Sequence, residues 1–384
     1  MLNFSYYAPT YYEFGKDKEK LVGKMIKSRG YRKVLLHYGG SFVVDSGLLD
    51  NVKSCLEHEN IDYICLGDVK ANPESDLVYK GIELCRNNNV DFILAIGGGS
   101  AIDSSKAIAA GILYEGDFWD FFCDDDRKIV EKTLPVGVIL TIAAAGSEGS
   151  PSMVITNSAT KQKRGNIKCD IVRPVFAIMN PEITMSLSSY QTACGIVDIM
   201  THVFERYFSN TKNCIVTDRM CESILKAMIE NGNKVINNPN DYDSRANIMW
   251  ASTVAHNNIC GVDREQDWAS HKIEHELSGL YGIAHGAGLA VIVIKWMKYV
   301  SKINPDKFVI FAKNIFNVDD IDEAINKLQE FWVALGMPST LKELGYKEED
   351  LNYLVDNIDY TKEGYVGNYV KLTRDDVRRI YCSN

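Results

Sequence analysis

The chain has 384 residues, of which 46% are hydrophobic and 24% are charged, and its formal net charge is −9. This length predicts two domains, and the composition is ordinary for a globular protein in water. The acidic balance and the lack of a basic stripe argue against a role in nucleic-acid binding.

Ten cysteines are scattered along the chain without a C-x-x-C pair, so we expect reduced thiols and a cytoplasmic location. The N-terminus lacks a basic stretch followed by an apolar one, and we expect no signal peptide. The apolar run at 288–294 is far shorter than a membrane span, so we expect no membrane partner.

Short apolar segments alternate with helical patterns through the first half of the chain. Strands are predicted at 33–40, 62–67, 91–100, 135–142 and within 176–189, and helices at 46–60, 75–89 and from residue 100 onward. Such alternation is typical of β-α-β units and a mostly parallel sheet. We therefore predict an α/β domain over residues 1–185.

Patterns with a period of 3.6 residues replace this alternation in the second half. Helices are predicted at 191–208, 214–231, 244–258, 265–278, 285–300 and 322–335. No convincing strand pattern accompanies them. We therefore predict an all-helical domain over residues 186–384.

The most informative glycine loop follows the strand predicted at 91–100. Gly97, Gly98 and Gly99 turn the chain, Ser100 is predicted to cap the next helix, and Asp103 would complete a capping box. The N–H groups and dipole of such a helix favour an anion, for example a pyrophosphate. A tight structural turn is the alternative, because the G-x-G-x-x-G fingerprint is absent.

Two further loops strengthen the nucleotide interpretation. Gly39 and Gly40 end another predicted strand, and the loop at 140–150 consists largely of small residues. Two strands of one sheet that both end in glycines favour binding of a dinucleotide at the carboxyl ends of the strands. For the third loop, close packing is an equally good explanation.

Three of the seven histidines lie in the segment ASHKIEHELSGLYGIAHGAG. His271 and His285 would be about 21 Å apart on one continuous helix. Two glycines between them are expected to break the helix, which lets both side chains converge. Upstream, Asp198 and His202 are four residues apart and share one helix face.

One carboxylate and three imidazoles suit Fe²⁺, Zn²⁺ or Ni²⁺. An Asp198–His202 pair that is hydrogen-bonded in the core is the alternative. His275 could be a ligand, a proton carrier or a neighbour of the metal. His271-x-x-Glu274-His275 also matches a zinc-peptidase motif, in which Glu274 would be the base. The remaining histidines are predicted to be structural or exposed: His37, His58 and His256.

Several motifs together resemble the iron-containing (group III) alcohol dehydrogenase family, within it the butanol dehydrogenase and aldehyde reductase branch. They are AIGGGSAIDSSKAIA, LTIAAAGSE, GIVDIMTHVFERYF and DWASHKIEHELSGLYGIAHGAGLA. The resemblance implies a dehydroquinate synthase-like architecture, with a Rossmann-like dinucleotide-binding domain and a helical metal-binding domain. It also implies an NAD(P)H-linked, metal-dependent enzyme that interconverts primary, butanol-like alcohols and aldehydes, and a homodimer.

The resemblance also assigns roles to the histidines. It implies Asp198, His202, His271 and His285 as ligands of a divalent metal, with Fe²⁺ expected first. It implies that His275 lies close to the metal without binding it, and that it relays protons or contacts the nicotinamide. His275 and the ligand His271 are thus the expected catalytic residues.

Cofactor contacts are implied as well. They are expected at Gly39, Gly40, Ser41, Asn72, Gly97, Gly98, Gly99, Ser100, Asp103, Thr141 and Lys163. Phe42, Val43 and Val44 depart from the family motif near the adenosine ribose, but the acidic residue of NAD-preferring relatives is missing after this strand. We therefore expect NADP, with NAD as the alternative.

Other functions of the same fold stay open at this point. A glycerol dehydrogenase-like enzyme or another polyol or lactaldehyde oxidoreductase would share the metal set. A sugar-phosphate lyase resembling dehydroquinate synthase would share the architecture. A nucleotide-binding sensor with a degenerate site is the non-enzymatic alternative.

Overall fold

The computed structural model describes residues 1–123, 127–166 and 169–383. The chain divides into two compact units, one of Tyr7–Met185 and one of Ser186–Asn384 together with Met1–Tyr6. None of the helices in the described part of the chain is both long enough and apolar enough to cross a bilayer.

A six-stranded sheet organises the unit Tyr7–Met185, with the order β1-β8-β5-β4-β2-β3 and parallel pairing throughout. Its strands are β1 (Tyr11–Phe14), β2 (Lys33–Gly39), β3 (Asp62–Val69), β4 (Phe92–Gly97), β5 (Val136–Leu140) and β8 (Phe176–Met179). The central strands β4, β5 and β8 are buried along their whole length, which explains their continuous apolar sequences. The predicted parallel α/β fold is confirmed.

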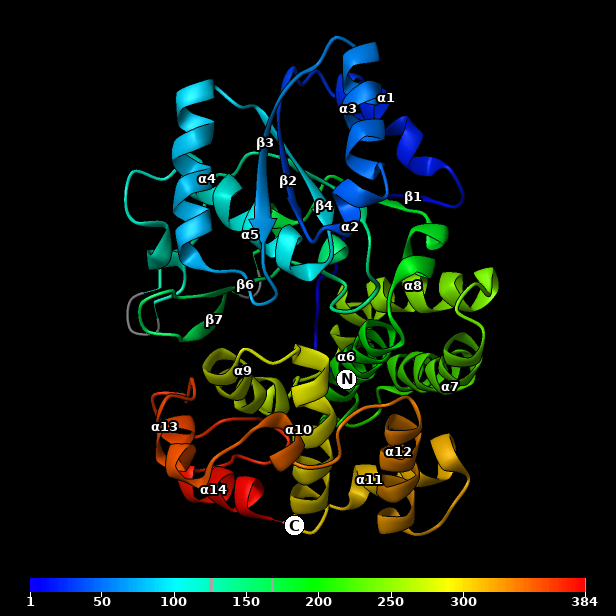
Figure 1. Ribbon diagram of the computed structural model, residues 1–384. Helices are drawn as coiled ribbons and strands as arrows, with labels where there is room; N and C mark the ends of the chain where they lie inside the picture. The colour runs from blue at the N-terminus through cyan, green and yellow to red at the C-terminus, as the bar shows by residue number, and fades with distance from the viewer. Residues whose placement is uncertain (124–126, 167–168, 384) are drawn as a thin grey trace. The chain divides into compact units, whose positions relative to one another are not determined.

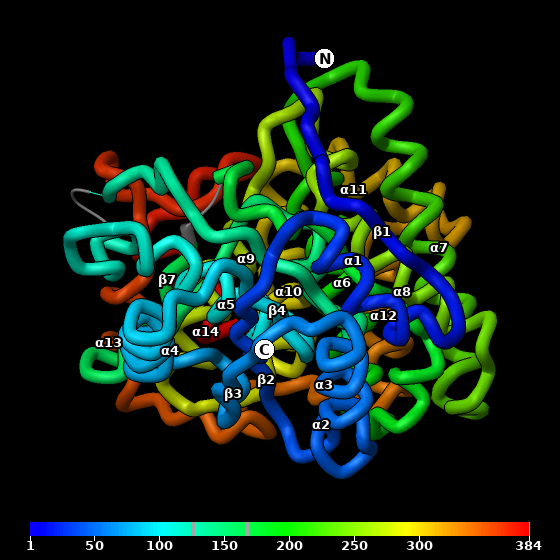
Figure 2. Tube along the Cα trace, turned by 90° about the horizontal axis from the view of Figure 1, so that it is seen from above, coloured from blue at the N-terminus to red at the C-terminus, as the bar shows by residue number. Residues whose placement is uncertain are grey.

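Helices cover both faces of this sheet. They are α1 (Val22–Lys27), α2 (Phe42–Asp45), α3 (Leu48–His58), α4 (Ser75–Asn88) and α5 (Gly99–Ile112). Apolar residues of α1 and α3 form one core with alternate residues of the strands, such as Val34 and Leu36. Figure 1 and Figure 2 show α3 and α4 on opposite sides of β2 and β3.

A short antiparallel hairpin, β6 (Met153–Thr156) and β7 (Lys163–Asn166), was not predicted. It joins the sheet domain through the backbone of its first strand, because Thr156 N–H donates to the carbonyl of Pro73 at 2.8 Å. The hairpin thereby brings Lys163 next to the segment that follows β3.

Helices make up the second unit, and its described residues contain no named strand. They are α6 (Ser189–Tyr207), α7 (Ile215–Asn237), α8 (Tyr242–His256), α9 (Ala269–Tyr281), α10 (His285–Val300), α11 (Asp306–Phe311), α12 (Ile321–Ala334), α13 (Leu351–Asp356) and α14 (Arg374–Cys382). The prediction of a helical second half is confirmed.

Helix α10 is the central element of this unit. Residues 286–294 are all buried, as expected for a helix that is apolar on every side. It packs against α6, α9, α12 and α14, and Figure 1 shows α6 and α9 beside it. The histidines predicted to be metal ligands lie on α6, α9 and α10.

Candidate metal centre

Helix α6 carries the first two predicted ligands on one face. Its N-terminus is fixed by a capping box between Ser188 and Gln191. Asp198 and His202 follow two and three turns later, both at least 95% buried. The Nε2 atom of His202 lies 3.3 Å from Oδ1 of Asp198.

The other two predicted ligands converge on the same carboxylate through a turn. Helix α9 ends at Gly282, whose φ of 66° is left-handed, and α10 begins at His285. Nε2 of His271 lies 3.8 Å from Asp198 Oδ1, and Nε2 of His285 lies 4.0 Å from it. The predicted helix break and the predicted start of a helix at His285 are therefore both present.

The donor atoms of this cluster fit a divalent cation. Asp198 Oδ1 and His271 Nε2 are buried and have no hydrogen-bond partner in the part of the chain that the structure describes, and His202 presents Nε2 at 3.3 Å from Asp198 Oδ1. Leaving such atoms without a partner is costly, whereas a cation would satisfy the carboxylate and the imidazoles together. One ligand atom from each of these three residues lies within 4.8 Å of the others.

Protonation differs between two of these imidazoles. Burial lowers the pKa of His202 well below its ordinary value, and the neighbouring rings of His256 and His271 act in the same direction. Burial also lowers the pKa of His271, but the neighbouring carboxylates of Asp198 and Glu205 outweigh it and raise the pKa to about 9. A cation at this site would thus displace a proton from His271.

Two glutamates that the sequence did not reveal as site residues contact the far side of two imidazoles. Glu205 Oε1 lies 2.8 Å from Nδ1 of His271, and Glu274 forms an ion pair with Nδ1 of His285. Glu205 follows Asp198 by seven residues, or two helical turns, and this spacing could have identified it. Glu274 was considered only as the base of a peptidase motif.

His275 lies beside the cluster, one turn after His271 on α9. Its ring centroid is 6.3 Å from that of His271 and 5.4 Å from that of His285. His275 also forms a possible ligand group with Glu274 and His285, whose donor atoms lie within 4.8 Å of one another. Geometry therefore places His275 next to the site without selecting its role.

Of the three other histidines, two are buried and one is exposed. His37 is fully buried and contacts the carbonyl of Leu66 at 2.9 Å and Ser104 Oγ at 2.8 Å. His58 is exposed. His256 is buried, and its ring centroid lies 4.0 Å from that of His202, a proximity that the sequence did not suggest.

The predicted glycine loops meet within the sheet domain. The carboxyl ends of β2 and β4 are neighbours, because these strands pair directly. Gly40 has a φ of 80°, which favours glycine. A Cβ at Gly98 would lie 1.9 Å from Cγ2 of Ile142, so the loop at 140–150 packs directly on the loop of Gly97–Gly99.

Most of the predicted cofactor residues lie at these strand ends. Gly39 closes β2, Ser41 precedes α2, and Gly97 closes β4. Thr141 N–H donates to the carbonyl of Gly97 at 3.1 Å. Asn72 and Lys163 come from different segments and form a hydrogen bond of 2.9 Å.

Two details of the glycine motif were predicted wrongly. Helix α5 begins at Gly99 and has Gly98 as its N-cap, so Ser100 lies inside the first turn and does not cap the helix. Asp103 does not complete a capping box. Its Oδ1 accepts a hydrogen bond from Ser147 Oγ at 2.5 Å and its Oδ2 accepts one from Val154 N–H at 2.9 Å, so both oxygens hold the following loops.

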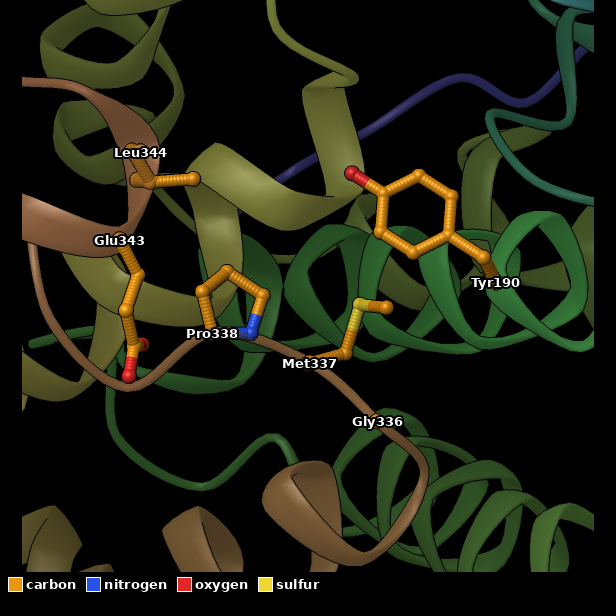
Figure 3. Close-up of a pocket in the computed structure, with 6 residues that line it drawn as sticks. All are labelled: Tyr190, Gly336, Met337, Pro338, Glu343 and Leu344. Atoms are coloured by element: carbon orange, nitrogen blue, oxygen red, sulfur yellow. The ribbon is translucent and has the colours of Figure 1, made fainter.

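A cavity of about 350 Å³ lies near the start of α6, lined by Tyr190, Gly336, Met337, Pro338, Glu343 and Leu344. Figure 3 shows Tyr190 facing Pro338 and Met337 across this space. The Glu343 carboxylate already accepts backbone hydrogen bonds from Ser339 and Thr340 at 2.6 and 3.1 Å. None of the predicted site residues lines this cavity.

Comparison with known families covers nearly the whole chain. The model described as iron-containing alcohol dehydrogenase matches residues 9–181. The model described as the C-terminal part of the Fe-containing alcohol dehydrogenase family matches residues 192–384.

Curated proteins match over their full length. The chain is 40% identical to the NADH-dependent butanol dehydrogenase A of Clostridium acetobutylicum, over 99% of both chains. It is 33% identical to the NADPH-dependent aldehyde reductase YqhD of Escherichia coli, again over 99% of both. Among solved structures, NADH-dependent butanol dehydrogenase A of Thermotoga maritima superposes with a TM-score of 0.95 at 38% identity, covering 99% of this chain and 98% of that one.

Proposed function

The chain belongs to the iron-containing alcohol dehydrogenase family and is an NAD(P)H-linked alcohol dehydrogenase or aldehyde reductase, and we propose that its reaction takes place at the Asp198 cluster. In this proposal Asp198, His202, His271 and His285 hold one divalent cation. The supporting observation is the set of buried carboxylate and imidazole atoms that lack protein partners. Fe²⁺ is the proposed ion, and Zn²⁺ and Ni²⁺ suit the same donors.

The chemistry proposed is the reversible interconversion of primary, butanol-like alcohols and aldehydes. A cation held there would supply Lewis acidity toward the substrate oxygen, and the nicotinamide would supply or accept the hydride. Asp198 offsets part of the positive charge of the site. His275, one turn from His271, is the proposed carrier of the proton that leaves or joins the substrate oxygen.

The nucleotide is proposed to bind at the strand ends of the sheet domain, at the residues identified from the sequence. β2 pairs with β3 on one side and with β4 on the other, so the order of the strands in the sheet reverses at β2. Such a reversal point is a common binding place for dinucleotides in open α/β sheets. Gly98 lets the loops approach closely. Asp103 supports this site by fixing the loop, since both of its oxygens are bound within the protein.

For the choice between nucleotides we propose NAD, in place of the NADP expected from the sequence. Residues 39–52 contain no Lys or Arg, and Asp45 adds a negative charge. Asp68, at the end of the adjacent strand β3, is exposed, and the next cation, Lys53, is 3.3 Å from Asp50. A 2′-phosphate requires Arg or Lys partners, whereas a 2′-hydroxyl can donate to a carboxylate.

This choice is tested by measuring kcat/KM with NADH and NADPH for one aldehyde. We expect at least about a tenfold preference for NADH, equivalent to 1.4 kcal/mol. The double variant Val44→Lys, Asp45→Lys should reduce that preference. An equal or greater kcat/KM with NADPH in the unmodified protein would refute the assignment.

The metal assignment is tested with His271→Ala. We expect loss of the bound metal and of aldehyde reduction, measured by elemental analysis and by NAD(P)H oxidation on one sample. His58→Ala is the matched control, because His58 is exposed on α3. Full turnover by metal-free His271→Ala protein would refute the metal assignment.

Alternative functions are not favoured by the similarity of the whole chain to butanol dehydrogenases and an aldehyde reductase. A peptidase would also need Glu274 as a base, but this side chain is fully buried and paired with His285. An aldehyde and polyol panel separates the proposed activity from that of a glycerol dehydrogenase-like enzyme.

Three further assignments are part of the proposal. Residues 1–185 are proposed to bind the dinucleotide, and residues 186–384 to bind the metal and carry the catalytic residues. The protein is proposed to be a cytoplasmic homodimer. Light scattering coupled to gel filtration tests the dimer, and fractionation of the source cells tests the location.

A further inference from the structure

Two buried glutamates hold the far sides of two imidazoles in the Asp198 cluster. Glu205 is 1% exposed and Glu274 is 0% exposed. Glu205 Oε1 lies 2.8 Å from Nδ1 of His271 and also accepts the N–H of His271 at 3.0 Å. Glu274 forms an ion pair with Nδ1 of His285. The rings of His271 and His285 therefore each have a carboxylate behind them.

We propose that Glu205 and Glu274 are positioning residues of the metal centre, which act through His271 and His285. This inference rests on the metal binding proposed above. A neutral imidazole has one N–H and one lone pair. A carboxylate that accepts the N–H at Nδ1 leaves the lone pair on Nε2, and it fixes the plane of the ring.

The direction of the rings agrees with this role. Nε2 of His271 and Nε2 of His285 lie 3.8 and 4.0 Å from Asp198 Oδ1, on the side away from the glutamates. His202 differs, because its Nδ1 has no hydrogen-bond partner among the described residues. Carboxylate support is thus confined to the two ligands that come from α9 and α10.

Each glutamate is itself held in place. Trp268 N–H and Ser270 Oγ donate to Glu205, both at 2.6 Å, so this carboxylate joins α6 to the first turn of α9. Glu274 occupies space that Gly288 leaves open on α10. A Cβ at Gly288 would lie 2.4 Å from Glu274 Oε1 and 2.8 Å from its Cγ. A side chain there would push the carboxylate from its place.

The test measures metal affinity in Glu205→Gln and Glu274→Gln. The metal-free proteins are titrated with Zn²⁺ against a chelating indicator, which requires no turnover. Each variant should bind Zn²⁺ about 10–100-fold more weakly than the unmodified protein. The matched control is Glu222→Gln, because Glu222 is also buried and accepts hydrogen bonds from Tyr207 and Asn314 away from the cluster.

A second pair of variants keeps both carboxylates. Gly288→Ala should weaken Zn²⁺ binding in the same way, since it displaces Glu274. Gly232→Ala is its control, because a Cβ there meets the ring edge of Phe331 at 3.0 Å and no ligand or glutamate. The visible d–d bands of the Co²⁺-loaded proteins should change in the Glu205 and Glu274 variants and stay constant in both controls.

The outcomes distinguish a failure of the proposed metal centre from a failure of the positioning role alone. If the unmodified protein and His271→Ala bind Zn²⁺ equally weakly, the metal centre itself is wrong, and this inference falls with it. If the unmodified protein binds Zn²⁺ tightly and Glu205→Gln, Glu274→Gln and Gly288→Ala bind within twofold of it, the positioning role alone is refuted. Weaker binding with unchanged metal-free thermal unfolding supports it.

Discussion

Acidification should destabilise the protein through one buried histidine of the sheet domain. His37 is fully buried on β2, and its ring nitrogens contact the carbonyl of Leu66 and Ser104 Oγ. Burial lowers its pKa from 6.5 to about 4, and the hydrogen bond to Leu66 only partly compensates. The carbonyl can only accept, so the neutral ring carries its proton on Nδ1.

The direction of the pH effect follows from the difference between the pKa of His37 in the unfolded chain and that in the folded protein. Between pH 6.5 and about 4 the unfolded chain binds a proton at His37 that the folded protein does not bind. The contribution to stability is therefore complete above pH 6.5 and decreases as the pH falls toward 4. At 1.36 kcal/mol per pH unit the loss amounts to about 3 kcal/mol.

The assay compares urea unfolding of the full chain with that of His37→Asn at several pH values. Asparagine can still donate to Leu66 but does not titrate, so the variant should lose less stability on acidification, and the difference between the two proteins should shrink by about 3 kcal/mol. His58→Asn is the control, because His58 is exposed. A constant difference between unmodified protein and His37→Asn from pH 7 to pH 4 would refute the reasoning.

Three other substitutions test separate parts of the molecule. His275→Ala should lower kcat by about 10²–10⁴-fold while the metal content by elemental analysis stays unchanged, as expected for a proton carrier that is not a ligand. Gly98→Ala should destabilise the protein by about 1–3 kcal/mol and weaken nucleotide binding in calorimetry, because its Cβ would overlap Ile142; the added substitution Ile142→Ala should restore part of both. Lys106→Met should lower the unfolding free energy by about 3 kcal/mol or more in urea titrations, because the buried ammonium bonds the carbonyls of Ser147 and Ser152 at 2.7 and 2.8 Å.

The arrangement of the sheet domain could be predicted from the apolar pattern of the sequence. A strand buried on both faces has a continuous apolar sequence, and a helix that covers it repeats every 3.6 residues, so β4, β5 and α4 were predicted close to their observed bounds. The edge strand β1 and the hairpin β6–β7 were missed. Both are four residues long, which is too short for alternation to stand out.

The convergence of the four proposed ligands could also be predicted, because two glycines indicate the break between α9 and α10. The helix cap could not. Ser100 is a better capping residue than Gly98 by preference, but the helix begins at Gly99, two residues earlier than a serine cap at position 100 would require, where Gly98 packs tightly on Ile142. The helix spacing places Glu205 on the face of Asp198, but its partner His271 lies 66 residues away, and Asp103 bonds Ser147, 44 residues away; local patterns do not report such partners.

Helix α10 also limits how the protein can be made more stable. Replacing a helical glycine by alanine ordinarily gains up to about 1 kcal/mol of helix propensity, and Gly286 and Gly288 are two obvious candidates in its first turns. A methyl group at Gly286 would lie 2.2 Å from the backbone oxygen of Cys194 on α6, and one at Gly288 would overlap Glu274. Stabilisation designed only from local helix propensity would therefore push apart the three helices that carry the proposed ligands.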